Sequence, residues 1–413
     1  MNIHTRYIFL FFLLGLFSCK STPSENKLFT TGDFNHQLET QVAKAMDYIP
    51  HLEVDSMAIP RSVKRDGSLH GTNSRSWTSG FYPGELWMLY EYSGEEALRE
   101  SALRWTQFVE KEKYDTHTHD LGFKVFCSFG QAYRITQEEK FKEVILHASA
   151  TLIRRYNPTV GAIRSWDFNQ EIWQFPVIID NMMNLEMLFE ATRLSGDSMY
   201  YDIAYQHART TLENHIRQDH STYHVIDFDT LTGKVRNRHT HQGQGHESTW
   251  ARGQAWNLYG FAMVYRETGD TRFLSQAKGV ADFIYNHPNM ESHGVPYWDF
   301  DADKIPNEPL DASAAAVAAS GLLILCELDT GLHSLMLPWV DKTLATLGEK
   351  EFATEVPPFL LDHSVGSIPG DFEVDVPLIY ADYYYIEALM RRIDLGKGDR
   401  NETSKNKLVL KAQ

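Results

Sequence analysis

The run LYGFAMVY (258–265), the turn TGD (268–270) and the run FLSQAKGVADFI (273–284) decide the fold. The first run is apolar nearly all round, which is typical of a helix buried on every side. The second run interleaves polar residues on one face, as an outer helix in contact with water does. Together they predict a hairpin made of one inner helix and one outer helix.

Similar turn signals recur at intervals of roughly 40 to 75 residues, at SGE (93–95), TQE (136–138), SGD (195–197) and TG (330–331). A first helix near residues 38–48 and a last one near 381–392 bring the expectation to about six hairpins. Six hairpins predict an all-α fold, an (α/α)6 barrel in a single domain. An open helical solenoid is the structural alternative. The few strand-like runs, such as residues 223–229, are expected to form hairpins in loops.

Composition excludes several classes of function. The formal net charge of −16 argues against nucleic acid as a partner. Beyond the first residues, no segment is long and apolar enough to span a bilayer. Cys127 and Cys326 lie inside apolar runs and are expected to be buried small hydrophobes. No Cys/His spacing resembles a zinc site, so we expect neither a metal nor another cofactor.

The first residues are typical of an export signal. Arg6 precedes an apolar run, residues 8–17, that is too short for a membrane helix, and the run ends in LFSC (16–19). This resembles the lipobox of bacterial lipoproteins, whose cysteine is acylated, so Cys19 is the predicted lipidation site. An ordinary cleaved signal is the alternative. The expected organisation is a signal peptide (1–18), a polar tether (19–33), the helical catalytic domain (34–395) and a polar C-terminal tail (396–413). The expected location is the bacterial periplasm or cell envelope.

The segments that precede the predicted inner helices are rich in aromatic and polar residues. In a closed barrel the inner helices run parallel, so their N-terminal ends share one rim. The acids there are Asp120, Asp180, Asp311 and the segment at Asp375. Each acid alone could be a helix N-cap. Two carboxylates converging on one cleft instead suggest acid/base work on a sugar.

Other side chains on this rim suit an acidic sugar. Trp77 and Trp256 could stack on a sugar face, although tryptophan is equally common in cores. Arg252, His224 and His241 supply positive or donor groups. An anionic substrate needs such local groups, because the net field of the protein repels it.

At these residues the sequence resembles the unsaturated glucuronyl hydrolases, glycoside hydrolase family 88. The resemblance extends in order over roughly residues 34–395, and its matching segments are WTSGF (77–81), HDLGF (119–123), DNMMN (180–184), WARGQAW (250–256) and DVPLIYADYYYIEAL (375–389). The unsaturated rhamnogalacturonyl hydrolases, which act on pectin fragments, share the barrel and are the nearest alternative. A non-catalytic glycan-binding lipoprotein is the alternative outside enzymes.

The resemblance implies hydration of the C4–C5 double bond that polysaccharide lyases leave in a terminal uronate. Asp180 matches the acid/base of the family and Asp120 the second essential carboxylate. Residues matching those that bind or flank the uronate are His224, Gln242, Arg252, the neighbouring His241, and the stacking walls Trp77 and Trp256. We expect Asp180 to be an N-cap, which favours its ionised form, whereas Asp120, Met182 and Met183 nearby should raise its pKa.

The segment HSVGSIP (363–369) bears on the choice of glycan. In family members that favour sulfated glycosaminoglycans, a Ser-x-x-Ser-x-Lys pattern here resembles a sulfate cradle. This chain keeps Ser364 and Ser367 but has Pro369 in place of the lysine. The alternative is that both serines only cap or turn the loop. The expected substrates are unsaturated heparin/heparan or chondroitin oligosaccharides, with at most partial tolerance of sulfate on the uronate. The sequence leaves the oligomeric state open.

Overall fold

The computed structural model describes residues 31–52 and 59–410, and side chains up to residue 397. The predicted signal peptide (1–18), the lipidation site Cys19 and most of the tether (19–33) lie outside the described residues. Within the described part of the chain, no helix combines the length and apolarity needed to cross a membrane.

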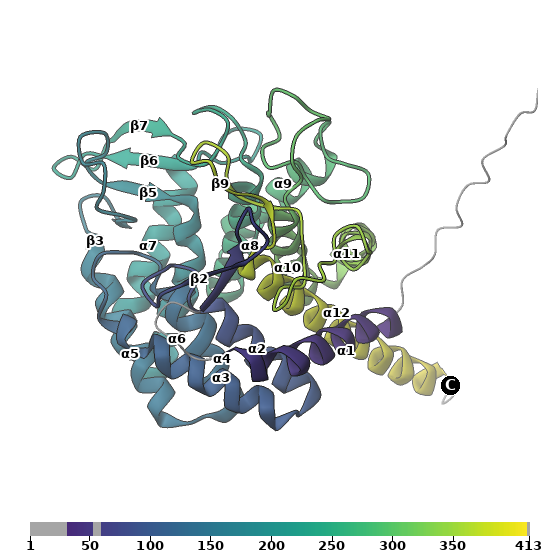
Figure 1. Ribbon diagram of the computed structural model, residues 1–413. Helices are drawn as coiled ribbons and strands as arrows, with labels where there is room; N and C mark the ends of the chain where they lie inside the picture. Colours follow the sequence, from purple (N-terminus) through teal and green to yellow (C-terminus); the bar gives the residue numbers. More distant parts are fainter. Residues whose placement is uncertain (1–30, 53–58, 411–413) are drawn as a thin grey trace, which may run out of the picture.

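Two concentric layers of helices form the molecule (Figure 1). The inner layer consists of α2 (Phe81–Ser93), the π-helix η3 (Gly122–Gly130) continued by α4 (Gln131–Thr136), α6 (Leu185–Ser195), α8 (Ala251–Thr268), α10 (Ala312–Leu328) and α12 (Ile379–Leu410). The outer layer consists of α1 (Thr31–Tyr48), α3 (Glu96–Val109), α5 (Glu139–Leu152), α7 (Ser198–Asn214), α9 (Thr271–Asn286) and α11 (His333–Leu347). Short 3-10 turns are η1 (Ile49–His51), η2 (Glu110–Tyr114), η4 (Ile153–Arg155), η5 (Ile179–Asn184) and η6 (Thr330–Leu332).

The inner ring is closed, because α12 packs against both α10 and α2. The predicted (α/α)6 barrel is therefore confirmed, and an open solenoid is excluded. The decisive hairpin also has the predicted burial. Every residue of α8 from Ala251 to Val264 is buried, whereas α9 buries one stripe that includes Phe273 and Ile284.

Gly-Asp pairs explain why two of the hairpins turn where the sequence predicted. Gly196 and Gly269 adopt the left-handed conformation that ends α6 and α8, which glycine reaches without steric cost. The next residues, Asp197 and Asp270, then accept hydrogen bonds from the first amides of α7 and α9. One dipeptide thus stops one helix and starts the next.

The strands are short and antiparallel, as expected for hairpins in loops. They are β1 (Ile59–Val63) with β2 (Leu69–Thr72), β3 (Tyr156–Asn157) with β4 (Ala162–Ile163), β8 (Ser364–Ser367) with β9 (Phe372–Val376), and the sheet of β5 (Pro176–Ile178), β6 (Val225–Phe228) and β7 (Val235–His239). Figure 1 shows β5, β6 and β7 together at one end of the molecule. The strand-like run 223–229 contains β6.

The first and last helices extend further than the sequence indicated. Helix α1 begins at Thr31, inside the predicted tether, and α12 continues to Leu410 through the predicted polar tail. The last helix was expected near residues 381–392, and in the structure it continues through Gly396 and Gly398. A helical glycine costs only about 1 kcal/mol, and no proline follows to break the helix.

Candidate active site

Asp180 lies in the first turn of η5, directly after β5. The expectation that it caps this helix is wrong, because Ile178 is the N-cap residue and no side chain caps the turn. Burial raises the pKa of Asp180 to about 7, and the charge of Asp120 adds to this rise, while Arg252 opposes it. The Asp180 carboxyl group can therefore hold or release a proton near neutral pH.

Close packing between two inner segments brings the Asp120 and Asp180 segments together. Gly122 begins η3, and a Cβ atom there would lie 2.6 Å from Cα of Asn184, so only glycine permits this contact. The Asn184 side chain accepts a hydrogen bond from the Phe123 amide at 3.1 Å. Asp120 therefore shares the rim with Asp180, and the pKa of Asp180 responds to its charge.

The orientation of Asp120 is set by its immediate neighbours in the sequence. Thr118 Oγ1 donates a hydrogen bond to Oδ2 at 2.6 Å, and His119 Nε2 lies 3.2 Å from Oδ1. The side chain stays 20% exposed, so it can still reach a ligand. Of the apolar neighbours expected for Asp180, Met182 is buried against Gly260 of α8, whereas Met183 lines a cavity enclosed by the inner helices.

His224 faces Asp180 as a neutral donor. Its Nδ1 accepts hydrogen bonds from the amides of His241 at 3.1 Å and Gln242 at 3.3 Å, so the ring proton is assigned to Nε2. Burial holds the pKa of His224 well below its usual value. His224 Nε2 lies 3.7 Å from Asp180 Oδ2, which is too long for a hydrogen bond.

Arg252 is buried, and its bonds go to protein atoms. It pairs with Asp311 at 3.0 Å, donates to the Gly366 carbonyl at 2.8 Å and also bonds the Val365 carbonyl. Asp311 in turn is the N-cap of α10. For this acid, the alternative that a rim acid only caps a helix is therefore correct. Gln242 Nε2 donates to the same Gly366 carbonyl at 3.1 Å. Arg252 thus acts on Asp180 through its charge in this structure.

The two tryptophans that were predicted to stack on the sugar, Trp77 and Trp256, differ in their exposure. Trp256 is 0% exposed, so it offers no face to a sugar, and its predicted stacking role is not supported. Its indole nitrogen makes no hydrogen bond of normal geometry but lies near enough to Asp180 to lower the pKa of that group slightly. Trp77 is half-buried and packs on Tyr380, with ring centroids 4.8 Å apart.

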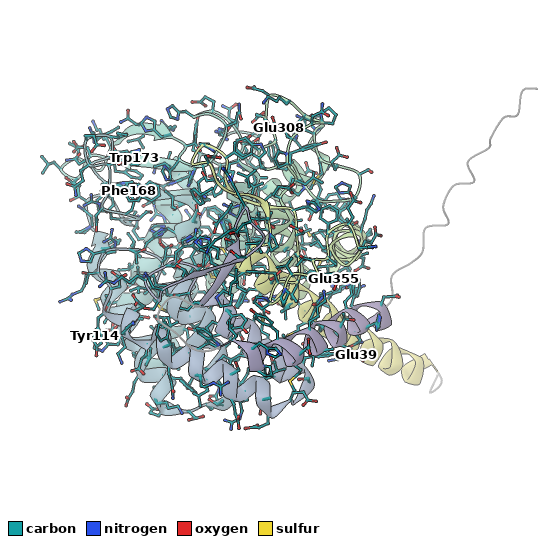
Figure 2. All side chains as sticks on the ribbon, viewed as in Figure 1. Glu39, Tyr114, Phe168, Trp173, Glu308 and Glu355 are labelled. Atoms are coloured by element: carbon teal, nitrogen blue, oxygen red, sulfur yellow. The ribbon has the colours of Figure 1, made fainter. Side chains whose placement is uncertain are left out.

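Two further tryptophans reach the site and were missed from the sequence. Trp250 packs on the His224 ring, with centroids 4.6 Å apart, and Arg252 lies 4.6 Å above Trp250. Trp166 lies 5.5 Å from the ring of the exposed His241. Trp250 begins the motif WARGQAW, so it could have been found there, whereas nothing in the sequence near Trp166 marked it. Figure 2 labels Phe168 and Trp173, which pack with Trp166 at the end that carries β5 to β7.

Several buried polar atoms in this region have no hydrogen-bond partner. They are Asp180 Oδ2, His224 Nε2, Trp256 Nε1, Trp166 Nε1 and Ser364 Oγ. Buried polar groups are nearly always paired, and each unpaired one costs about 1–3 kcal/mol. Three of them, Asp180 Oδ2, His224 Nε2 and Trp256 Nε1, lie close together. A polar ligand at that point would supply missing partners.

The two serines of the predicted sulfate cradle differ in their surroundings. Both lie in β8, in the hairpin that precedes α12. Ser367 Oγ accepts a hydrogen bond from the Gly370 amide at 3.1 Å, as the turn alternative expected. Ser364 is buried and its hydroxyl is unpaired.

A cavity of about 1130 Å³ is lined mainly by the C-terminal halves of the inner helices and reaches Gly122 and Met183, but Asp180 does not line it. Its charged side chains are paired with one another, for example Arg134 with Glu91 and Arg391 with Glu327. We place the chemistry at the opposite rim, where the acids and the unpaired donors are.

In the described residues, no group of three or more His, Cys, Asp or Glu side chains is arranged to hold a metal ion.

Comparison with known proteins agrees with an active site at the rim that carries Asp120 and Asp180. The profile of Glycosyl Hydrolase Family 88 matches residues 53–271, which include Asp120, Asp180 and Arg252. The chain belongs to glycoside hydrolase family 88. An unsaturated glucuronyl hydrolase from Formosa agariphila is 43% identical over 401 residues, covering 94% of this chain and 99% of the relative. An unsaturated chondroitin disaccharide hydrolase from Streptococcus pneumoniae is 33% identical, covering 77% and 82%.

Solved structures of this family 88 hydrolase group share the barrel. An unsaturated glucuronyl hydrolase specific for heparin superposes with a TM-score of 0.84 at 44% identity, covering 88% of this chain and 98% of that one. The unsaturated glucuronyl hydrolase of Bacillus sp. GL1 superposes with a TM-score of 0.79 at 29% identity, covering 88% and 96%.

Proposed function

We propose that this glycoside hydrolase removes the terminal 4,5-unsaturated glucuronate from glycosaminoglycan oligosaccharides released by lyases, of the heparin/heparan or chondroitin type. The names of its relatives support this substrate class. The observation that carries the proposal is Asp180, a buried carboxyl group with a pKa of about 7 and an unpaired oxygen, facing the unpaired Nε2 of His224.

In the proposed reaction, Asp180 acts first as an acid and then as a base. Its carboxyl group donates a proton to C4 of the C4=C5 double bond, and positive charge develops at C5 and the ring oxygen. A water molecule then adds at C5 and returns a proton to Asp180. The hemiketal formed at C5 opens by breaking the bond between C5 and the ring oxygen, which leaves a ketone at C5 and a hemiacetal at C1. The hemiacetal then breaks its bond to the remaining sugar, which leaves as an alcohol, and C1 becomes an aldehyde. The proton count of the enzyme is unchanged after one turnover.

The neighbouring residues have distinct proposed roles. Asp120, held by Thr118 and His119, accepts hydrogen bonds from ring hydroxyls and orients the sugar. His224 donates Nε2–H to the substrate or to the attacking water. Gln242 and His241 are proposed to bind the uronate carboxylate. Arg252 is proposed to attract it through its positive charge. The half-buried face of Trp77 is proposed to support the ring.

The test is the ultraviolet absorbance of the unsaturated uronate, which disappears when the double bond is hydrated. We expect purified protein to remove the absorbance of unsaturated chondroitin or heparan disaccharides. A panel that includes unsaturated rhamnogalacturonan fragments distinguishes the pectin alternative. Loss of absorbance with the pectin fragments alone would contradict the proposed substrate, and no loss with any fragment would favour the non-catalytic glycan-binding alternative.

We also propose that the protein is a lipoprotein of the periplasm or cell envelope, anchored through Cys19. The LFSC sequence (16–19) after a short apolar run supports this. Cys19→Ala should release the protein from the membrane fraction or block its processing. Equal solubility of the wild-type protein and the variant would contradict the anchor.

A further inference from the structure

Arg61 of β1 and Glu373 of β9 form a two-pronged ion pair beside the proposed active site. Arg61 Nε lies 2.6 Å from Oε1 of Glu373, and Nη2 lies 3.0 Å from Oε2. The two side chains are 18% and 5% exposed. The planar fork of a guanidinium group binds carboxylate, phosphate and sulfate in this two-pronged manner, so an external anion could take the place of the Glu373 carboxylate.

Further donors converge on the same carboxylate. Ser62 Oγ donates to Glu373 Oε1 at 2.7 Å, and His70 Nδ1 lies 3.5 Å from that oxygen. Burial alone would raise the pKa of Glu373, but the hydrogen bond and charge of Arg61 outweigh it and hold the pKa below its usual value. Glu373 is therefore an anion held in a pocket of cationic and hydroxyl donors.

The pocket adjoins the proposed substrate site on two sides. Glu373 lies against Gly366, where an added Cβ atom would come 2.7 Å from Glu373 Cβ. The Gly366 carbonyl accepts the bonds from Arg252 and Gln242 described above. On the other side, Arg61 Nη1 donates at 3.1 Å to Ser76, the residue before Trp77.

The backbone at Glu373 is in an unfavourable conformation. Its φ of 53° lies in the left-handed region, which glycine tolerates and glutamate rarely adopts. Such a residue costs on the order of 1 kcal/mol and persists where its surroundings fix it, often at functional sites. Here the conformation accompanies a carboxylate that points into the donor pocket.

We propose that the Glu373 carboxylate is a built-in anion that fills an anion-binding pocket formed by Arg61, Ser62 and His70. It restricts the enzyme to acidic sugars that carry no sulfate on the ring face turned toward β8 and β9. A sulfate group there would meet the negative charge of Glu373 in place of the free donors. The specificity part of this proposal rests on the proposed function, whereas the pocket itself does not.

The first test compares matched unsaturated disaccharides with and without sulfate on the uronate. The ratio of kcat/KM for the sulfated to the unsulfated substrate should rise at least about tenfold in Glu373→Gln, which removes the charge but keeps the shape. It should rise further in Glu373→Ala, which also opens space. The matched control is Glu327→Gln, which removes one acid from an ion pair with Arg391 at the far end of the barrel and should leave the ratio unchanged. A ratio within twofold of wild type in both Glu373 variants would overturn the proposal.

The second test needs no turnover and so remains informative if the proposed function fails. Sulfate and chloride at equal ionic strength are compared by thermal unfolding of the wild-type protein, Glu373→Ala and Glu327→Ala. Sulfate stabilises most proteins generally, so the two reference proteins set the baseline. Glu373→Ala should gain several degrees more in Tm than either of them, because sulfate ion replaces the missing carboxylate. An equal gain in all three would show that no anion pocket exists there.

Discussion

Asp180 Oδ2 and His224 Nε2 face one another but form no hydrogen bond. At 3.7 Å no atom fits between them, but one water molecule or substrate atom placed beside the pair could bond to both. His224 cannot approach as a cation, because two amides fix its proton on Nε2 and burial keeps the ring neutral. A neutral donor beside a carboxyl group that titrates near pH 7 suits a reaction in which Asp180 must be first an acid and then a base.

Asp180→Asn should fold normally and lose nearly all turnover, by about a thousandfold or more in kcat, because an amide cannot donate and recover the proton. Asp180 caps no helix, so the fold does not depend on its charge. Steady-state absorbance assays give kcat, and unfolding midpoints check the fold. Asp120→Asn should also be severely impaired through lost orientation of the sugar. An Asp180→Asn variant with a large fraction of wild-type kcat would remove the acid/base assignment.

The pH dependence should reflect the protonated form of Asp180. Because its pKa is raised to about 7, the group is mostly protonated below pH 7 and ionised above it. The acid form begins the reaction, so kcat/KM should fall about tenfold per pH unit above roughly pH 7 to 8. Initial rates from pH 5 to 9 at constant ionic strength measure this. Activity that rises through pH 8 would show that the ionised form is the active one.

At the scale of elements, the inner ring depends on glycines where neighbouring helices touch. A Cβ atom on Gly84 of α2 would lie 2.2 Å from the Cys127 carbonyl of η3 and 2.6 Å from the Tyr383 ring of α12. Gly84→Ala should therefore force α2 away from both neighbours and lower stability by roughly 1–3 kcal/mol. Denaturant unfolding measures the loss. Gly245→Ala is the control, because no atom lies within 4 Å of its Cβ position; equal effects of the two would argue against tight helix contact.

Two buried histidines should make stability depend on pH. His207 of α7 accepts a hydrogen bond from the Ile163 amide of β4, and His215, just after α7, contacts the Val177 carbonyl of β5. Burial lowers the pKa of His207 to about 3 and of His215 to about 4, against about 6.5 in the unfolded chain. Above pH 6.5 both states are neutral and the effect vanishes. Below it only the unfolded chain binds protons, so stability should fall by about 1.4 kcal/mol per pH unit for each histidine, until pH reaches its folded pKa.

Unfolding free energies measured from pH 7.5 to 4.5 test this dependence. His215→Gln should flatten the slope, since an amide can still donate to the Val177 carbonyl that His215 Nε2 contacts at 2.9 Å. The exposed His36 provides the matched control, and His36→Gln should leave the slope as it is. Identical slopes for wild type and His215→Gln would count against the buried neutral histidine.

At the scale of the whole molecule, an acidic protein is proposed to bind an acidic sugar. The net charge of −16 repels such a substrate at long range. The barrel concentrates Arg252 and neutral donors at one rim, where burial strengthens their local effect. The proposed chemistry needs only carboxyl groups and water at that rim.

Activity should therefore survive overnight chelation followed by removal of the chelator. The described residues hold no group of three potential metal ligands, and the proposed hydration uses Asp180 and water. The assay is the same absorbance measurement before and after treatment. Activity that disappears and returns with added Ca²⁺ or Zn²⁺ would contradict the prediction.

The sequence left open whether the ring closes, because an open solenoid has the same repeat. By itself it determined the hairpin repeat, the division into inner and outer helices, and the rim segments that carry Asp120, Asp180 and Arg252. It could do so because these depend on local patterns. Gly-Asp pairs end and start helices within a few residues, and apolar periodicity separates inner from outer helices. The family motifs lie at the starts of the same helices.

The tertiary structure alone decided which atoms at that rim are free. Trp250 and Trp256 stand six residues apart in one motif and both are buried, yet Trp250 packs on His224 whereas Trp256 packs on Phe123. Likewise, Arg61 and Glu373 are 312 residues apart and meet only because β1 packs beside β9. The burial, pKa and hydrogen bonds of a side chain depend on neighbours that are distant in sequence. The sequence therefore shows which chemical groups the protein has, but not which of them face the substrate.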